Sequence, residues 1–344
     1  MIIKPLTSLR FFFAFFVFLS HLSFLENSKF YSLIYNQVFK EGFLGVSFFF
    51  ILSGFVLSLN YNTITKSYIR KFYLYRLARI YPVYLLTLLL SIFIVKGSVY
   101  KFIIQIFSIQ SFFPNQEIYF SYNAPSWSIS DEFFFYLLFP FIISFFRKIS
   151  FTLKTIVTII LCVTVISITT YTPIEKQHYY IYIFPLMRIV DFIIGIYLFY
   201  LCDLIKSKNY IKKNSIIIEF SALIIFTLFF YFHEEIHLSY RYSSYYWIPM
   251  SLIILSVSSQ YYIKDYKPIL INKLLSHKVF VYLGEISFCF YMIHYLVILF
   301  ISKYLMISNN TILIFLILTT SLFISFISYK FIEKPMNKIF KKII

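Results

Sequence analysis

Charged residues are scarce in this chain of 344 residues: 13% are Asp, Glu, Lys or Arg, whereas 60% are hydrophobic and 23% are aromatic. Soluble domains are roughly one quarter charged and about half apolar. A soluble protein of this composition could not cover its surface with polar groups. The composition therefore excludes a cytosolic globular enzyme, and it also excludes a disordered or fibrous chain. The class that remains is a polytopic membrane protein.

Cysteine and acidic residues are also few. The three cysteines (Cys162, Cys202 and Cys289) lie in or beside apolar runs without CxxC spacing, so we interpret them as small buried hydrophobic residues. Only 14 residues are acidic against 31 Lys and Arg, which gives a net charge of +17. In a soluble protein this excess would suggest a nucleic-acid partner. In a membrane protein the first question is which side of the bilayer the positive charges occupy.

Ten apolar runs are long enough to cross a bilayer, because a helix needs roughly 20 apolar residues to span the roughly 30 Å hydrocarbon core. The predicted fold class is therefore an all-α polytopic membrane protein. The predicted spans are residues 6–25, 43–60, 74–95, 130–147, 151–171, 182–202, 216–232, 246–262, 282–301 and 311–331. The run 102–113 is too short to cross and is typical of a re-entrant or interfacial helix. Three of the six glycines (Gly42, Gly45 and Gly54) lie in or beside the second span, where they would permit close helix approach.

The positive charges predict the orientation of these spans. With the N-terminus in the cytoplasm, 23 Lys and Arg fall on the inner side, seven fall on the outer side, and Arg188 lies within a span. This bias follows the positive-inside rule and predicts that both termini are cytoplasmic. Most of the net charge is thus explained by topology and by attraction to anionic lipid, and no nucleic-acid partner is required.

The N-terminal apolar run is expected to be a retained first helix. Lys4 precedes it, as in a signal peptide, but the run lacks a small-residue cleavage site and exceeds the length of an h-region. No segment between spans is long enough to fold alone. We therefore expect residues 1–344 to form a single integral membrane domain with no appended soluble domain.

Ionisable residues inside the predicted spans are functional candidates, because they are costly to bury in lipid. His21 is predicted in the outer half of the first span, and Glu132 enters the fourth span from outside. Arg188 and Asp191 are i,i+3 neighbours in the outer half of the sixth span. We expect these four side chains to converge. A histidine beside carboxylates can remove a proton from a hydroxyl near neutral pH.

A basic group is predicted at the inner side of the membrane. Arg10 lies eleven residues before His21, and Arg76 and Arg79 form an R-x-x-R pattern on the first turn of the third span. Two arginines one turn apart can bind a polyphosphate with paired hydrogen bonds. The two groups together suggest a phosphate-bearing acyl donor such as acyl-CoA, entering from the cytoplasm, and an alcohol acceptor that lies deeper or outside.

Each candidate also has a purely structural interpretation. An R-x-x-R pattern at a cytoplasmic helix end is usually ordinary positive-inside charge. Arg188 and Asp191 could form an intramembrane ion pair that only stabilises the bundle. His294, on an aromatic face of the ninth span, could simply hydrogen-bond to a neighbouring helix.

Six segments in order carry a family resemblance. They are Leu6–Arg10 with Ser20–His21, Gly42–Phe55 (GFLGVSFFFILSGF), Tyr75–Pro82 (YRLARIYP), Ser126–Tyr136 (SWSISDEFFFY), Gly284–His294 (GEISFCFYMIH) and Phe331–Pro335 (FIEKP). In this arrangement the chain resembles the membrane acyltransferase-3 superfamily, the bacterial O-acyltransferases of surface polysaccharides. The resemblance extends from residue 6 to residue 335.

The resemblance implies O-acyl transfer, most simply of acetyl from acetyl-CoA, to a saccharide or glycolipid acceptor at the bacterial inner (cytoplasmic) membrane. Succinyl and longer acyl chains remain open. His21 would act as the general base or as an acyl relay, and Glu132 would orient His21 or the sugar hydroxyl. Arg76 and Arg79, with Arg10, would hold the CoA phosphates, and no metal is expected. The expected substrate-contacting or supporting residues are Trp127, Arg188, Asp191 and His294.

Two departures from the family pattern affect these expectations. Asp131-Glu132 is followed by Phe133, where the family would have a more polar residue. Many family members also carry an extracellular esterase-like domain, and this chain ends at residue 344 without one. The final transfer is therefore expected at the membrane domain or through a separate periplasmic or extracellular transferase.

One motif suggests another class of enzyme. Residues 233–237 (HEEIH) fit H-E-x-x-H, which on a helix places two histidines on one face for zinc, with the glutamate as base. An intramembrane zinc metalloprotease is therefore an alternative. Against it, the motif lies at the outer end of the seventh predicted span, and the next carboxylate, Asp265, is predicted on the other side. A polysaccharide transporter is a third alternative, because ten spans suit it equally well.

Overall fold

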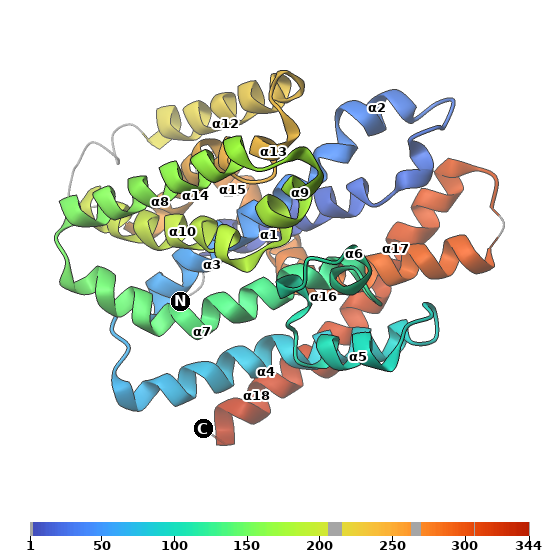
Figure 1. The fold of residues 1–344 in the computed structure, drawn as a ribbon, viewed down its shortest axis with the longest axis horizontal. Helices are drawn as coiled ribbons and strands as arrows, with labels where there is room; N and C mark the ends of the chain where they lie inside the picture. Colours follow the sequence, from blue (N-terminus) through green and yellow to red (C-terminus); the bar gives the residue numbers. More distant parts are fainter. Residues whose placement is uncertain (1–2, 206–214, 263–269, 306, 344) are drawn as a thin grey trace. The chain divides into compact units, whose positions relative to one another are not determined.

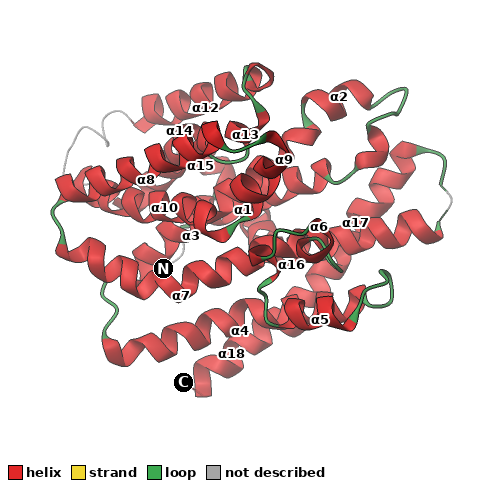
Figure 2. Cartoon of the chain, viewed as in Figure 1, coloured by secondary structure: helices red, strands yellow, loops and turns green. Residues whose placement is uncertain are grey.

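The structure is a computed structural model that describes residues 3–205, 215–262, 270–305 and 307–343. All regular elements in these residues are helical (Figure 2). Each of the ten predicted runs coincides with one long helix. These helices are α1 (Lys4–Ser20), α3 (Leu44–Tyr61), α4 (Lys66–Ser91), α7 (Trp127–Lys148), α8 (Phe151–Tyr171), α10 (Pro185–Ile205), α12 (Ser215–Tyr231), α14 (Trp247–Tyr262), α16 (Lys278–Tyr304) and α17 (Asn310–Ser328).

Five helical segments of the described chain are long and apolar enough to cross a membrane. They are Ser32–Tyr61, Ala124–Lys148, Phe151–Tyr171, Lys278–Tyr304 and Asn310–Phe340. A sixth candidate is the pair Ile174–Ile183 and Pro185–Ile205, which is bent by 45°. The all-α class and the presence of several candidate spans are thus confirmed, whereas the number of ten spans and their orientation stay predictions.

Short helices connect the long ones. They are α2 (Ser32–Gln37), α5 (Val99–Ile106), α6 (Gln116–Tyr119), α9 (Ile174–Gln177), α13 (Leu238–Arg241), α15 (Leu270–Leu275) and α18 (Lys334–Ile343). The predicted short helix at 102–113 corresponds to α5 and the following 3-10 turn, Gln110–Phe112. Ser98 caps α5 by accepting a hydrogen bond from the Lys101 amide. The helix buries Ile104 and exposes Val99, as expected of a helix with two unlike faces.

The chain divides into two compact units. The first comprises Met1–Phe11, Val46–Ile64 and Leu138–Glu285, and the second comprises Phe12–Gly45, Thr65–Leu137 and Ile286–Ile344. In the first unit, α10 packs against α8 and α14, and α14 packs against α12 (Figure 1). Gly54 allows α3 to approach α10 closely, because a Cβ there would lie 2.0 Å from the Phe192 carbonyl oxygen.

The second unit contains most of the predicted site residues, including His21, Glu132 and His294. Here α18 lies along α4, and α5 packs beside α4 (Figure 1). Gly42 lies against the last turns of α1, and a Cβ at this position would be 2.0 Å from the Phe16 carbonyl oxygen. The predicted role of the glycines in close helix approach is therefore confirmed at Gly42 and at Gly54.

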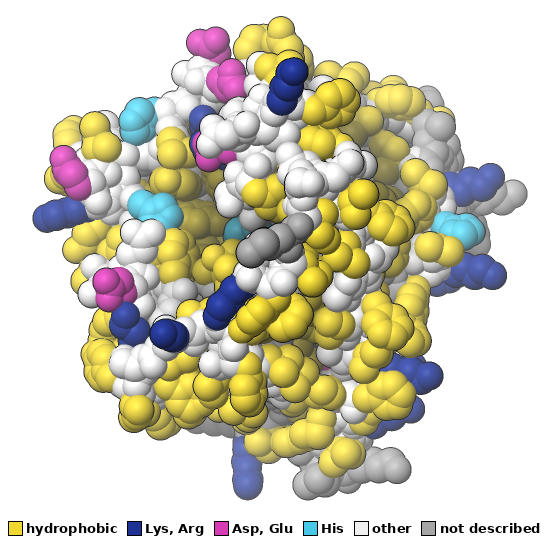
Figure 3. Space-filling model, turned by 90° about the vertical axis from the view of Figure 1, so that its right-hand side faces the viewer, with side chains coloured by type: hydrophobic (Ala, Val, Ile, Leu, Met, Phe, Trp, Pro, Cys, Tyr) yellow, Lys and Arg dark blue, Asp and Glu magenta, His cyan; other side chains and the backbone are white. Residues whose placement is uncertain are grey.

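Apolar side chains are prominent on the surface as well as in the interior. Hydrophobic residues cover much of the face in Figure 3. Along α8, for example, Ile156, Ile159, Ile160 and Val163 are all exposed. Contiguous exposed apolar surface is unusual in a soluble monomer and is what contact with lipid requires.

Candidate active site

His21 lies directly after the last residue of α1, where the helix ends and the backbone turns. The Tyr35 hydroxyl donates a hydrogen bond of 2.9 Å to the Ser20 carbonyl oxygen, one of the helix-end carbonyls that lack a partner within the helix. Together with the close approach at Gly42, this contact fixes the end of α1. The His21 side chain is partly exposed.

His294 is the partner of His21. Its Nε2 lies 2.9 Å from Nδ1 of His21, and the ring centroids are 5.1 Å apart. His294 is fully buried in α16, and its Nδ1 lies 3.1 Å from the Phe290 carbonyl oxygen. The Tyr295 ring packs edge-on against His21 at 5.2 Å. The two imidazoles, which we call the histidine pair, therefore form a hydrogen-bonded unit between residues 273 positions apart.

The segment that leads into α7 is attached to α16 one turn before His294. Asn123 donates a hydrogen bond of 2.8 Å from Nδ2 to the Met292 carbonyl oxygen, and the Ser128 and Tyr291 hydroxyls lie 2.8 Å apart. Trp127 is the first residue of α7 and is buried. In the sequence it lies between Asn123 and Ser128, which both contact α16. The structure thus brings the Trp127 segment to the helix that carries His294, as part of the same unit.

Glu132 is linked to the arginine pattern through Tyr136. The Tyr136 hydroxyl donates to a carboxylate oxygen of Glu132 one helical turn earlier, and the Arg76 guanidinium lies 6.0 Å from the centre of the Tyr136 ring. This ring contact places Arg76 in cation–π range. Arg79 follows on α4 and, like Arg76, is partly buried. Sequence reasoning missed Tyr136, although its i,i+4 spacing from Glu132 was a usable signal.

Arg188 is fully buried in the first unit. Its Nη1 donates to the Tyr242 carbonyl oxygen at 2.5 Å, and its Nη2 donates to the Ser47 hydroxyl at 2.8 Å. The rings of Phe50 and Tyr182 lie 5.2 and 5.7 Å from the guanidinium carbon. The guanidinium therefore joins α10 to α3 and to the segment before α14.

Asp191 is the acidic partner of this group. One of its carboxylate oxygens lies 3.6 Å from Nη1 of Arg188, and both side chains are fully buried. The carboxylate also accepts hydrogen bonds from the Ser243 hydroxyl at 3.0 Å and from Nε1 of Trp247 at 3.1 Å. Protein groups thus surround both charges, which favours the structural interpretation of the pair. Ser243 and Trp247 could not be identified from the sequence, because both contacts join distant parts of the chain.

The candidate residues fall into the two units as follows. The second unit holds His21, Trp127, Glu132, Arg76, Arg79 and His294, and the first unit holds Arg10, Arg188 and Asp191. The convergence of His21 and Glu132 with Arg188 and Asp191 therefore stays a prediction. So does the grouping of Arg10 with the two arginines of α4.

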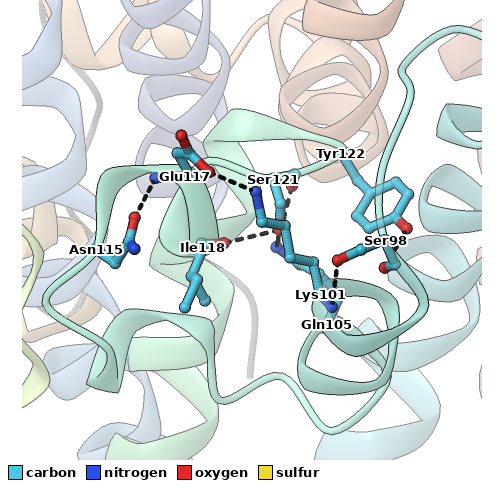
Figure 4. A network of polar contacts seen from close by, with 8 residues as sticks. All are labelled: Ser98, Lys101, Gln105, Asn115, Glu117, Ile118, Ser121 and Tyr122. Atoms are coloured by element: carbon cyan, nitrogen blue, oxygen red, sulfur yellow. Dashed lines mark hydrogen bonds and ion pairs between the residues drawn. The ribbon is translucent and has the colours of Figure 1, made fainter.

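A polar network outside the predicted spans fixes the segment between α4 and α7 (Figure 4). Lys101 donates to Glu117 at 2.9 Å, and this ammonium holds the pKa of the Glu117 carboxyl below its usual range. Gln105 donates to the Ser121 carbonyl oxygen at 3.0 Å. The next residue, Tyr122, has a φ of 61°, in the strained left-handed region. These contacts hold the backbone immediately before Asn123.

The HEEIH motif does not form the helix face that zinc binding requires. His233–Glu235 is a 3-10 turn, and His237 lies beyond it as the N-cap of α13. Nδ1 of His233 lies 2.6 Å from the Phe230 carbonyl oxygen, and Nδ1 of His237 lies 2.8 Å from the Ser239 hydroxyl. Asp265 lies outside the described residues. This geometry does not support the metalloprotease alternative.

Comparison with known proteins adds evidence from the whole chain. A family described as an acyltransferase domain matches residues 4–330. The acyltransferase MdmB of Streptomyces mycarofaciens is 35% identical over 161 residues, which cover 43% of this chain and 41% of the relative. The O-acetyltransferase OatA of Staphylococcus aureus (strain NCTC 8325 / PS 47) is 27% identical over 333 residues, which cover 88% of this chain and 54% of the relative.

A putative O-acetyltransferase of Staphylococcus aureus (strain COL) is 25% identical over 347 aligned residues, with the same two coverages of 88% and 54%. The chain thus spans about half the length, or less, of these curated relatives. No solved structure matches it. The matched range of 4–330 confirms the resemblance to the membrane acyltransferase-3 superfamily, and the chain belongs to this family of acyltransferase domains.

Proposed function

We propose that this protein is a membrane O-acyltransferase. It would move an acyl group, acetyl in the simplest case, from cytoplasmic acyl-CoA to a hydroxyl of a cell-surface or lipid-linked saccharide. The proposal includes ten spans with both termini in the cytoplasm, in a bacterial inner membrane. The observation that carries it is the histidine pair, held at a nitrogen–nitrogen distance of 2.9 Å within a chain of the acyltransferase-domain family.

His21 would supply the reacting nitrogen, because it is the partly exposed member of the pair whereas His294 is fully buried. As a general base, His21 takes the proton of the acceptor hydroxyl while the oxygen attacks the thioester carbonyl. The carbon–sulfur bond breaks, and the CoA thiolate takes up a proton. As an acyl relay, His21 accepts the acyl group from CoA first and then passes it to the hydroxyl.

Arg76 and Arg79 would bind the phosphates of the donor. They lie three residues apart on α4, so both guanidinium groups can reach one polyphosphate. Arg10 is proposed to assist them. The hydrogen bond from Tyr136 to Glu132, with Arg76 against the Tyr136 ring, supports a connection between the donor side and α7.

Two relatives are described as O-acetyltransferases, which supports a hydroxyl acceptor. That this hydroxyl belongs to a saccharide is proposed from the family resemblance. The acceptor would be reached at the membrane domain or through a separate periplasmic or extracellular transferase. Polysaccharide transport is the remaining alternative. Movement of saccharide across the membrane without release of CoA from acyl-CoA would favour transport over acylation.

Mass spectrometry of surface glycans tests the proposal in cells that express the wild-type protein or its His21→Ala variant, or that lack the gene. The wild-type glycan is expected to be heavier by one acyl group. His21→Ala is expected to lower acylation by about 10²–10⁴-fold at equal membrane abundance. Equal acylation in wild-type cells and in cells without the gene would contradict the proposed function.

A further inference from the structure

We propose that His294 fixes the proton position on His21, so that Nε2 of His21 is the atom that takes the proton or the acyl group. This inference rests on the proposed function and adds a positioning role for His294. It follows from the two hydrogen bonds that His294 makes, one with each of its ring nitrogens.

The hydrogen bond between His294 and the Phe290 carbonyl shows which ring nitrogen of His294 carries the hydrogen. Its Nδ1 lies 3.1 Å from the Phe290 carbonyl oxygen, and a carbonyl oxygen can only accept a hydrogen bond. Nδ1 of His294 therefore carries the hydrogen. A neutral imidazole has one N–H, so Nε2 of His294 has the lone pair.

The hydrogen bond between the two histidines then determines which nitrogen of His21 carries the hydrogen. Because Nε2 of His294 has the lone pair, it must accept the hydrogen bond at 2.9 Å, and Nδ1 of His21 must donate it. His21 then has its hydrogen on Nδ1 and its lone pair on Nε2. The Phe290 carbonyl on α16 thus constrains, through two imidazoles, which nitrogen of His21 is basic, and the backbone of Val17 is a further hydrogen-bond partner of His21.

Aromatic rings keep the pair in this geometry. The Phe290 ring stacks on His294 with centroids 5.9 Å apart, and the Phe18 ring meets His294 edge-on at 6.0 Å. The position of α16 is in turn fixed by the bond from Asn123 to the Met292 carbonyl oxygen. A half-turn of the His294 ring would put Cδ2 in the place of Nδ1 and Cε1 in the place of Nε2, so both hydrogen bonds would be lost.

The arrangement favours the transition state over the ground state. When Nε2 of His21 accepts the hydroxyl proton, His21 becomes an imidazolium, and its hydrogen bond to His294 becomes charge-assisted and stronger. In the relay route, Nε2 attacks the thioester carbon, the carbon–sulfur bond breaks, and CoA leaves as the thiolate. The acyl-imidazolium keeps the hydrogen bond from Nδ1 to His294. The acceptor hydroxyl oxygen then attacks the acyl carbon, the bond from this carbon to Nε2 breaks, and the hydroxyl proton passes to water.

Two substitutions of His294 test the role of the acceptor nitrogen in the full-length protein reconstituted in lipid vesicles. His294→Ala removes the acceptor, and His294→Gln replaces it with an amide oxygen. We expect His294→Ala to lower kcat by about 10–100-fold, as for other groups that orient an imidazole, with the KM for acetyl-CoA unchanged. We expect His294→Gln to restore kcat to within about tenfold of wild type, because the Gln oxygen can still accept from Nδ1 of His21.

The pH profile of kcat separates positioning from a structural role. Without the acceptor, the His21 imidazolium loses a stabilising hydrogen bond, so His21 is harder to protonate and the acidic limb of the His294→Ala profile should move to lower pH than in wild type. The His294→Gln profile should stay in place, and a shift of the His294→Ala limb to higher pH would contradict the acceptor role. His237→Ala, a change at an exposed histidine far along the chain, is the matched control and should leave kcat unchanged. Release of CoA from acetyl-CoA is the readout.

Wild-type kcat in His294→Ala, or loss of activity in folded His294→Gln as severe as in His294→Ala, would overturn the inference. If His294→Ala does not fold, the His294→Gln result decides alone: near-wild-type kcat supports the acceptor role, and loss in a folded protein contradicts it. Failure of the proposed function has a different signature, because the wild-type protein would then release no more CoA than His21→Ala.

Discussion

Tyr136 connects the acidic and the basic candidates of the second unit at the level of single residues. Its hydroxyl donates to Glu132, and Arg76 lies 6.0 Å from its ring centre. A cation–π contact is made with the face of the ring and does not itself use the N–H groups of a guanidinium as hydrogen-bond donors. The contact is therefore compatible with phosphate binding by Arg76.

This geometry predicts the effect of removing the two arginines of α4. Arg76→Ala with Arg79→Ala should raise the KM for acyl-CoA by about 10²–10⁴-fold, because hydrogen bonds to charged groups contribute about 1.5–3 kcal/mol each and every 1.4 kcal/mol is about tenfold. Steady-state CoA release at varied donor concentration measures this change. Arg70→Ala is the control, because Arg70 is exposed on the same helix. Unchanged donor affinity in the double variant would remove both arginines from the donor site.

At the scale of helices, the apolar runs predicted each long element because a run of apolar residues in this composition has no stable alternative to a helix in lipid. One of these helices begins well before its apolar run. The third run was predicted from residue 74, but α4 begins at Lys66, since polar residues such as Arg70 continue a helix without adding to its hydropathy. Hydropathy alone does not detect the polar end of such a helix.

The site was predictable only in part, for a related reason. His21 and Glu132 are candidates because an ionisable residue inside an apolar run is conspicuous in the sequence. The bond between His21 and His294 joins residues 273 positions apart, and the bond from Trp247 to Asp191 joins two helices. Such pairs depend on how the helices pack, which local periodicity does not encode.

The Arg188–Asp191 pair holds α10 in the first unit, and this predicts a large cost for breaking it. Asp191→Ala should lower the free energy of unfolding by about 3–5 kcal/mol, because Arg188 would remain buried without its carboxylate partner. Denaturation of the purified protein in detergent measures the change. Glu175→Ala alters an exposed carboxylate of the same unit and should change stability by less than about 0.5 kcal/mol. Equal stability of the two variants would contradict the structural role of the pair.

The Lys101–Glu117 pair shows how pH acts on an element outside the predicted spans. Lys101 holds the pKa of Glu117 below its usual range. The stabilising contribution of this ion pair is therefore fully present at pH values above the ordinary carboxyl pKa. It is lost only as pH falls through the lowered pKa. At the near-neutral pH of a transfer assay the Lys101–Glu117 pair is therefore intact.

For the whole molecule, the distribution of positive charge predicts the sides of the membrane. Lys29 and Lys71 are both exposed and are separated by one predicted span, and Lys148 and Lys176 are separated by another. If α3 and α8 each cross the bilayer, the two members of each pair must lie on opposite sides. The positive-inside rule assigns Lys71 and Lys148 to the cytoplasm.

Single cysteines at these four positions test the assignment, in a protein whose three native cysteines are replaced by alanine. In intact cells a membrane-impermeant maleimide should label Lys29→Cys and Lys176→Cys, and it should label Lys71→Cys and Lys148→Cys only after the membrane is opened. The two pairs flank different helices, α3 and α8, so each tests one crossing independently. Labelling of both members of a pair in intact cells would show that the helix between them does not cross. Reversed labelling of both pairs would keep the spans but place Arg76 and Arg79 on the outer side, where cytoplasmic acyl-CoA could not reach them.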